Sequence, residues 1–287
     1  MDFKAKRFDH IQKNISSSSK LAENNFQSVV ELDSNRMLIG TWGDGLILYD
    51  RNRKTFTNYH YKQNDPNSIS NNFIRTIYKD QNKNIWIGTY GGGLNKFDIK
   101  RKKLIRYFYD SRNPNSISSN SIVTVYQDSR NIMWIGTEGG GLNKLNPDNK
   151  TFTRYQHQAN NNKSLSSNDI YCIYEDEHNG FWVGTASGLD RFDVTFNEFD
   201  HYLQEPNSIN FLSNNYVYSI QVAQNGRDSS MWVGTASGLY RFDRKSGDYK
   251  RYTEENGLPN RVICGILEDN NGFLWLSTNR GLSRFVP

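Results

Sequence analysis

Short runs rich in isoleucine, valine, tyrosine and phenylalanine alternate with polar turns along most of the chain. Between residues 73 and 109, four such runs cover residues 73–79, 85–90, 94–98 and 104–109, separated by turns of Asp, Asn, Gly and Lys. β-Branched and aromatic residues favour strands, whereas an amphipathic helix repeats its apolar residues about every 3.6 positions. No helical period is found, so the pattern predicts four short antiparallel strands, named A to D here in chain order.

This unit of four strands recurs six times. Its most distinctive stretch, residues 85–98, is repeated almost letter for letter at residues 133–145, and its tryptophan or a substitute stands at positions 38, 86, 134, 182, 232 and 275. The spacings are 48, 48, 48, 50 and 43 residues. A period of this length is typical of propellers and other arrays, and four antiparallel strands with short turns describe one blade. The sequence therefore predicts an all-β fold, a six-bladed β-propeller, in one domain over residues 1–287.

The two ends of the chain are predicted to complete one blade together. The last repeat stops after strand C at residues 281–285, while residues 6–12 form an isolated strand-like segment before the first repeat. Pairing this segment with the last three strands would close the ring and remove its exposed edges. The alternative is a fragment of a seven-bladed or tandem propeller. The predicted blades are residues 26–61, 73–109, 121–157, 169–203, 216–252, and 262–286 completed by 6–12.

Three recurring residues have a packing explanation. Trp in strand B offers a large flat surface to the neighbouring blade, the Gly after it permits close approach, and Gly in the B–C turn supplies a positive φ. In strand A, the position three residues before the turn aspartate is predicted to form a ring in the core. Counted in this way, its members are Val30, Ile77, Val125, Ile173, Ile220 and Ile266.

Composition argues against several classes of protein. No run of 18 apolar residues is present, so no membrane-spanning helix is predicted, and the first residues lack the apolar core of a signal peptide. The net charge is only +5, and the basic runs 51–54 and 100–103 fall in the same turn of successive repeats, which favours solvated turns over nucleic-acid contact. Cys172 and Cys264 are interpreted as small buried strand residues, and sequence alone assigns no disulfide between them.

The repeat resembles the two-component regulator propeller repeat. The resemblance rests on Trp-Ile-Gly-Thr followed by Gly-Gly-Gly-Leu-Asn-Lys-Phe-Asp, and on connectors at residues 65–70, 113–118, 205–209 and 256–260. It covers essentially the whole chain and implies the ligand-sensing ectodomain of a membrane-bound histidine kinase, hybrid kinase or related signalling protein. Such sensors often respond to glycan fragments. The family usually builds seven-bladed rings, often in tandem, before a linker domain and a transmembrane helix, whereas this chain has six repeats and none of those segments.

The resemblance also bears on location and on enzymatic alternatives. It implies a periplasmic or extracellular place for an excised sensor domain, and a cytoplasmic one otherwise. A more distant resemblance is to streptogramin lyase propellers, which use a histidine base and an acidic partner at the mouth of the ring. Histidines occur at positions 10, 60, 157, 178 and 201, all in or after strand D or in an A–B turn. A general base must reach its substrate, so a lyase ranks third among the interpretations.

The B–C turns and the D–A crossings of a propeller share the face around the channel mouth, where ligand-binding residues are expected. The first three B–C turns are one residue longer than the last three and include Trp42, Asp44, Tyr90 and Glu138; the last short turn includes Arg280. Aromatic faces beside carboxylates suit a sugar, through stacking and hydrogen bonds. The alternative is that Trp42 and Tyr90 only cover their glycine turns.

Two columns in strand A supply further candidates. The residue that enters strand A is Asn in five repeats, where it either faces the axis or caps its own turn. Arg261 replaces it in the sixth repeat, and a guanidinium suits a carboxylate such as that of a uronic acid. Three residues further in, Arg75, Tyr171 and Tyr218 interrupt a small or apolar column that begins with Ser28. They are predicted either to line the channel or to pack between blades.

No metal-ligand spacing, phosphate-binding loop or nucleophile with a base is visible, so no catalytic residue, metal or cofactor is predicted, and no enzyme. The sequence instead predicts a sensor propeller that recognises a glycan-like or other polar small molecule at the mouth. The alternative is a protein–protein interaction scaffold, because propellers often present a flat face to partners. The expected partners are a small molecule or oligosaccharide, or a protein or second copy, without nucleic acid or membrane contact.

Overall fold

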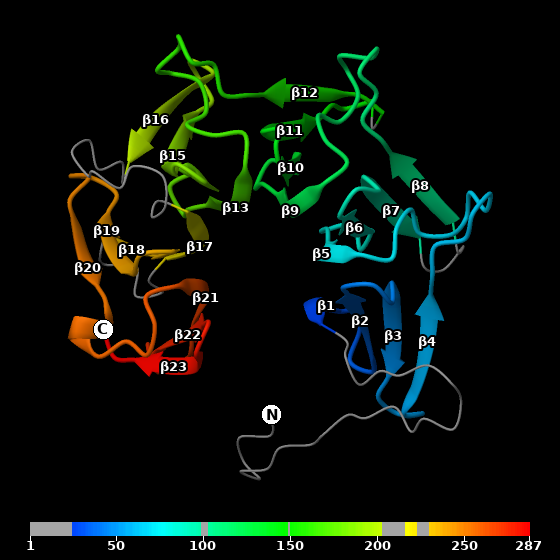
Figure 1. Ribbon diagram of the computed structural model, residues 1–287, viewed down its shortest axis with the longest axis horizontal. Coiled ribbons are helices and arrows are strands. Elements are labelled where there is room, and N and C mark those ends of the chain that lie inside the picture. The colour runs from blue at the N-terminus through cyan, green and yellow to red at the C-terminus, as the bar shows by residue number, and fades with distance from the viewer. Residues whose placement is uncertain (1–24, 99–102, 149, 203–215, 223–229) are drawn as a thin grey trace.

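The structure, a computed structural model, describes residues 25–98, 103–148, 150–202, 216–222 and 230–287. Within these ranges the chain forms 23 strands and one short 3-10 helix, Glu254–Asn256. The strands make six antiparallel sheets around a common axis, as Figure 1 shows. The predicted all-β, six-bladed propeller is confirmed. No helix in these ranges has the length and apolar character needed to cross a membrane.

The blades follow one another along the chain. Blades 1 and 2 contain β1 (Phe26–Glu31), β2 (Arg36–Thr41), β3 (Leu46–Asp50), β4 (Thr55–Tyr59), β5 (Ile74–Lys79), β6 (Ile85–Thr89), β7 (Leu94–Asp98) and β8 (Lys103–Tyr107). Blades 3 and 4 contain β9 (Ile122–Gln127), β10 (Met133–Thr137), β11 (Leu142–Leu145), β12 (Phe152–Tyr155), β13 (Ile170–Glu175), β14 (Phe181–Thr185), β15 (Gly188–Asp193) and β16 (Glu198–Tyr202). Blades 5 and 6 contain β17 (Val217–Val222), β18 (Ser230–Thr235), β19 (Leu239–Asp243), β20 (Tyr249–Tyr252), β21 (Ile263–Glu268), β22 (Leu274–Thr278) and β23 (Gly281–Phe285).

Each sheet runs in chain order from an innermost first strand to an outer last strand. In Figure 1 the first strands, from β1 to β21, surround the centre, and β4, β8, β12, β16 and β20 lie at the rim. Five sheets have four strands, and the sixth has three in the described residues. Residues 6–12, the predicted partner of β23, lie outside the described residues, so closure by that segment stays a prediction.

A buried tryptophan in the second strand joins one blade to the next. Trp86 is 1% exposed and packs with Ile122 and Val125 of the following blade, as the sequence predicted for this residue. Its indole Nε1 donates a hydrogen bond of 2.9 Å to Oδ2 of Asp80, in the turn before the strand. A buried indole N–H needs such a partner. The same bond occurs in the pairs Trp134–Asp128, Trp182–Asp176 and Trp275–Asp269.

The glycine two residues after the tryptophan lets neighbouring blades approach closely. A Cβ on Gly88 would lie 2.7 Å from Cγ2 of Ile122 in the next blade, and a Cβ on Gly136 would meet Ile170 at the same distance. Any larger residue would force the blades apart. The apolar residues that fill this position are fully buried: Ile74, Ile122, Ile170, Val217 and Ile263.

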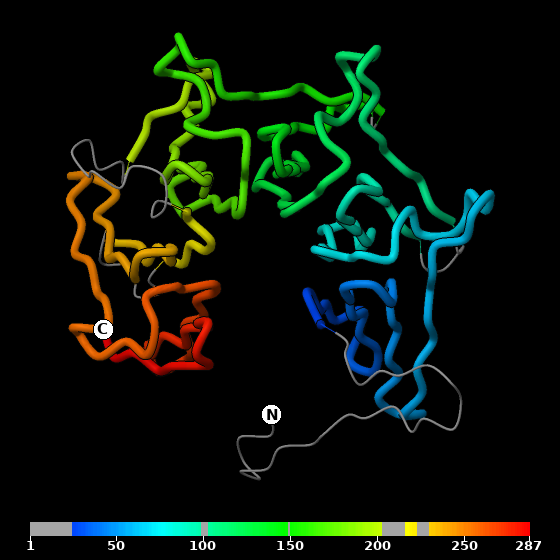
Figure 2. The backbone as a smooth tube through the Cα atoms, viewed as in Figure 1, coloured from blue at the N-terminus to red at the C-terminus, as the bar shows by residue number. Residues whose placement is uncertain are grey.

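The junction between blade 6 and blade 1 departs from this pattern. Ser277 stands where the other blades have the close-approach glycine, and Phe26, which is 61% exposed, stands where they have the buried Ile or Val. Figure 2 shows the tube open between the first and last blades, and within the described residues no packing comparable to that of the other junctions joins β21 to β1. We name the surface formed by Phe26, Val29, Leu267 and Leu282, all more than 60% exposed, the seam.

Blade 1 corrects one detail of the sequence prediction. Its A–B turn is one residue shorter than that of blade 2, so counting back from the turn aspartate shifts strand A by one position. β1 pairs Val29 with Ile39, which is the pairing that Ile77 makes with Ile87 in blade 2. Val29 therefore holds the register position of Ile77, but it is 62% exposed, whereas Val30 is partly buried and packs against the core of blades 1 and 2. A shift of one residue moves every side chain to the opposite face of a strand.

The two cysteines are free thiols in different surroundings. Cys172 is half-buried between blades, and burial raises the pKa of its thiol to about 12. Cys264 is exposed on β21, contrary to the prediction of a buried residue. The difference arises because Cys264 lies on the last inner strand, where no following blade covers it within the described residues.

The seam gives a direct comparison of two equivalent leucines. Leu142→Ala is expected to lower the free energy of unfolding by about 2–5 kcal/mol, because Leu142 is fully buried between blades. Leu282→Ala should change it by less than about 0.5 kcal/mol, because Leu282 is 66% exposed. Urea denaturation of both variants measures the difference. Equal large losses would show that Leu282 is covered in solution.

Candidate ligand-binding site

The turns between the second and third strands of each blade form the rim of the channel mouth. In blade 2, Gly91 and Gly93 adopt φ angles of 82° and 76°, and the Thr89 hydroxyl donates a hydrogen bond of 2.8 Å to the Gly93 carbonyl. Positive φ is readily available only to glycine. In blade 4 the matching bond runs from Thr185 to the carbonyl of Gly188, one residue sooner. The predicted difference in turn length between the first and last blades is thus present.

The first residue of each long turn is fixed by its backbone. Its N–H donates to a carbonyl at the start of the inner strand of the same blade, at 2.9 to 3.0 Å. The side chain therefore starts from a rigid point at the rim, although the turn itself is exposed. The three pairs are Trp42 with Asn25, Tyr90 with Phe73, and Glu138 with Ser121.

Arg75 reaches the mouth because it occupies a β-bulge. The pairing of β5 with β6 passes from Ile74 to Thr76 and leaves Arg75 unpaired. Bulges of this kind redirect a side chain away from the regular alternation of a strand. Every inner strand has the same irregularity, and the unpaired residues are Gln27, Arg75, Val123, Tyr171, Tyr218 and Cys264. The predicted column is thus correct except in blade 1, where Gln27 replaces Ser28.

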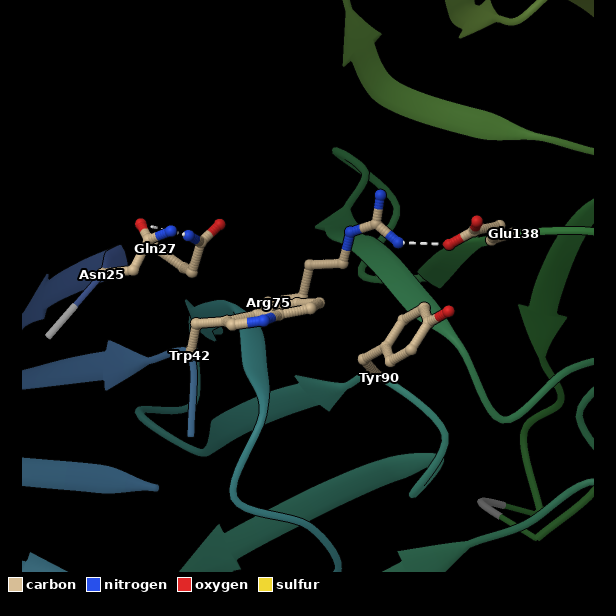
Figure 3. A pocket seen from close by; sticks show the side chains of 6 residues that line it. All are labelled: Asn25, Gln27, Trp42, Arg75, Tyr90 and Glu138. Carbon is tan, nitrogen blue, oxygen red and sulfur yellow. Dashed lines mark hydrogen bonds and ion pairs between the residues drawn. The ribbon is translucent and has the colours of Figure 1, made fainter. Parts of the chain in front are cut away.

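Four of the predicted candidates line one pocket of about 400 Å³, and two further residues complete it. The ring centroids of Trp42 and Tyr90 lie 5.3 Å apart at an angle of 44°, and Trp42 also meets Phe73 edge to face. Both rings remain about two-fifths exposed. Figure 3 shows them below the Arg75 guanidinium. The six lining residues are Asn25, Gln27, Trp42, Arg75, Tyr90 and Glu138.

An ion pair crosses the pocket between blades 2 and 3. Nη1 of Arg75 lies 2.5 Å from Oε2 of Glu138 (Figure 3). The Arg75 side chain is 24% exposed and that of Glu138 is 46% exposed. Within the described part of the chain, the guanidinium makes no other hydrogen bond. The pocket therefore offers a positive group with free donors, a carboxylate and two aromatic faces.

The structure adds Gln27, which the sequence did not assign to the site, and places it beside Asn25, one of the asparagines for which an axis-facing role was one of two interpretations. Asn25 and Gln27 lie on the opposite side of the pocket from Glu138, and the Gln27 amide donates to the Asn25 side chain at 2.7 Å. They reach the mouth because of the one-residue shift in blade 1. The shorter A–B turn of that blade was the signal in the sequence that could have revealed this shift.

The asparagines that enter the inner strands have a structural task in blades 2 to 4. Their side-chain oxygens accept hydrogen bonds of 2.7 to 2.8 Å from backbone N–H groups eleven residues earlier, at the start of the connector. These bonds give the three asparagines a capping role at the start of the connector, whereas the sequence interpretation placed the cap in the adjacent turn. The pairs are Asn72 with Tyr61, Asn120 with Tyr109, and Asn168 with His157.

The remaining candidates lie outside the pocket. Asp44 is half-buried in its turn, where its backbone N–H donates to Thr41. Tyr171 and Tyr218 pack edge to face at 5.3 Å, and both contact Tyr216, so they form an aromatic cluster between blades 4 and 5. Arg261 and Arg280 are exposed at blade 6 and do not line the pocket. Whether any of these residues binds a ligand stays a prediction.

Other titratable groups in the described residues serve the scaffold. His201 lies on β16 and bonds Asp190, and His157 bonds the carbonyl of Leu165, so neither reaches the pocket. Asp176, Glu177 and His178 lie within 4.8 Å of one another, the spacing of a metal site. Asp176, however, accepts a hydrogen bond from the Trp182 indole N–H. It also forms an ion pair of 3.0 Å with Arg244, which belongs to the next blade. The cluster is explained as a junction between blades.

Comparisons with known proteins agree with this architecture. The family model of the two component regulator propeller matches residues 68–91, 116–139, 164–187 and 257–280, each of which spans a connector, an inner strand and a second strand. The chain is thus similar to this repeat in four segments. Among curated proteins, none matches the chain.

Solved structures share the fold at low sequence identity. The extracellular domain assigned to the hybrid two component system BT3049 of B. thetaiotaomicron aligns with 96% of the chain at 23% identity and a TM-score of 0.75. The extracellular domain assigned to the one component system BT4673 of the same organism aligns with 90% of the chain at 21% identity and a TM-score of 0.69. PorZ, a surface component of the type-IX secretion system of Porphyromonas gingivalis, aligns with 90% of the chain at 19% identity and a TM-score of 0.68. The chain spans 35%, 32% and 38% of those three proteins, or about a third.

The Tyr171 cluster predicts a loss of stability in strong base. Burial, with help from the nearby Asp169 carboxylate, raises the pKa of Tyr171 to about 12. Because an unfolded tyrosine titrates near pH 10, the stabilisation is complete below that pH and is lost as pH rises toward 12. Urea denaturation at several pH values should show this fall, and Tyr171→Phe should make it shallower. An unchanged slope in the variant would contradict the burial of this hydroxyl.

Proposed function

We propose that this chain, which contains two-component regulator propeller repeats, is the ligand-sensing domain of a two-component-type signalling protein. The repeats support the connection to such regulators, and the shared fold with extracellular domains assigned to one- and two-component systems agrees with it. The same neighbours support a periplasmic or extracellular location. Signal output would then lie in other parts of the protein.

The ligand proposed for the mouth pocket is a polar small molecule of the glycan type. The observation behind this proposal is the pocket itself, in which two exposed aromatic rings lie beside an ion pair and two amides. Sugar rings present an apolar face that stacks on aromatic side chains and hydroxyl groups that need donors and acceptors. The pocket provides both kinds of contact within about 400 Å³, a volume suited to one or two sugar units.

The pocket does not favour an enzyme. Its residues include no histidine, cysteine or serine, and its carboxylate is paired with an arginine. A nucleophile with an adjacent base, or two carboxylates flanking a bond, is the usual requirement for hydrolysis or acyl transfer. We therefore assign binding, and not catalysis, to this surface.

A protein-interaction scaffold is the second candidate, and the seam is the observation that favours it. Its exposed apolar residues lie on blades 1 and 6, among them Leu267 at 71% and Leu282 at 66%, and none of them lines the mouth pocket. Large exposed apolar side chains often mark a place where a protein binds a partner. The two candidates concern different surfaces and can both hold.

Substitution of the aromatic rings tests the ligand proposal. A ligand that binds only the folded protein raises the melting temperature with concentration, so neutral and acidic oligosaccharides are screened by thermal shift. Trp42→Ala and Tyr90→Ala should each weaken binding about 3- to 10-fold, from the loss of one stacking contact. Isothermal titration calorimetry gives the affinities.

Two variants serve as matched controls. Phe196→Ala removes an aromatic ring that is 73% exposed on the turn before β16, and Arg53→Ala removes an exposed arginine on the turn between β3 and β4, outside the pocket. Both should bind like the parent chain. If no oligosaccharide raises the melting temperature of the parent, or if the controls lose as much affinity as the pocket variants, the proposed site is rejected.

A further inference from the structure

Arg75 holds more hydrogen-bonding capacity than the protein uses. A guanidinium has five N–H donors in a planar fork. One of them contacts Glu138, through a single pair of atoms 2.5 Å apart, and the other donors have no partner among the described residues. The side chain is nevertheless held in place, because it leaves the bulge of an inner strand and is only 24% exposed. The fork is thus positioned and mostly unoccupied.

Glu138 is a replaceable partner for this arginine. Its side chain is 46% exposed and comes from a turn of the neighbouring blade. Its contact with Arg75 is a single hydrogen bond from Nη1 to Oε2, whereas a carboxylate that bonds two nitrogens of the guanidinium makes two parallel hydrogen bonds. An ion pair as exposed as this one contributes little to stability, so breaking it costs the protein little. A ligand carboxylate can therefore compete with the Glu138 carboxylate for the same cation.

The surrounding groups fit a ring that bears such a carboxylate. Figure 3 shows the guanidinium above the Trp42 and Tyr90 rings, with Asn25 and Gln27 on one side and Glu138 on the other. A ring stacked on Trp42 or Tyr90 would place an attached carboxylate within the reach of Arg75. Its hydroxyl groups would then meet the amides of Asn25 and Gln27.

We propose that the mouth pocket selects an acidic sugar of the uronic-acid type, whose carboxylate displaces Glu138 from Arg75. This inference rests on the proposed function, since it names the ligand class of the same pocket. Glu138 acts as a stand-in carboxylate that satisfies Arg75 until the ligand arrives and then moves into solvent. Selection for acids over neutral sugars follows, because only a carboxylate offers the Arg75 guanidinium an opposite charge and two parallel hydrogen bonds.

Calorimetric titration with matched sugars tests this selection. The probes are D-galacturonic acid with D-galactose, and D-glucuronic acid with D-glucose, at pH 7 and low salt. The parent chain should bind each acid at least about tenfold more tightly than its neutral partner, the ratio expected for one charge-assisted bidentate contact. D-Gluconate, an open-chain acid, separates the carboxylate from the ring and should bind more weakly than either uronic acid.

Two substitutions assign the roles of the ion pair. Glu138→Gln removes the competing charge and keeps the size of the side chain, so the acids should bind about 3- to 10-fold more tightly while the neutral sugars are unaffected. Arg75→Lys keeps the charge but removes the fork, so the preference for acids should largely disappear. Both side chains are partly exposed, and melting curves of the variants verify that they fold.

The outcomes separate the two proposals. Equal binding of acids and neutral sugars, lost in Trp42→Ala, would overturn the acidic ligand and leave the glycan pocket standing. Weaker binding of acids by Glu138→Gln would show that Glu138 contacts the ligand directly, which also overturns the displacement. If none of the sugars binds the parent chain, then the proposed function itself is rejected for these probes.

Discussion

The hydrogen bond between a buried tryptophan and the aspartate of the preceding turn is the interaction on which the other features depend. In blade 3, the Trp134 indole donates to Asp128 at 3.0 Å, while the other carboxylate oxygen holds the turn through the backbone of Arg130 and Ile132. The tryptophan can therefore be 1% exposed, with its only polar atom satisfied, and can cover the next blade. Turn, strand and junction between blades are thus fixed by one side-chain pair.

Because this interaction holds the scaffold together, the turns between the second and third strands, at the channel mouth, can differ in sequence from blade to blade. The positions of Trp42, Tyr90 and Glu138 are equivalent in three successive blades, and each backbone is anchored to its own inner strand. Their side chains contribute little to the core, so substitution there changes the surface of the mouth without changing the fold. The β-bulge in β5 places Arg75 in the same pocket. Its side chain can vary in the same way, because Arg75 takes no part in strand pairing.

The fold was predictable because a repeated sequence pattern indicates a repeated packing arrangement. Six copies of the pattern made the strand assignment clearer than any single copy would. The long turns were visible for the same reason, which is why Trp42, Tyr90 and Glu138 could be named together. The features that could not be predicted are local ones. The register of blade 1 depends on a turn shortened by one residue, so Gln27 was missed. The exposure of Leu282 depends on what packs against the last blade in space, and a repeat pattern does not contain that information.

The mouth pocket is the proposed place where a ligand binds. A crystal structure of the chain with D-galacturonic acid tests this most directly. The account predicts electron density for the sugar between Trp42, Tyr90 and Arg75, with its carboxylate on the guanidinium and Glu138 turned toward solvent. Density at the Tyr171 cluster or at the seam, with the Arg75–Glu138 pair intact, would contradict it.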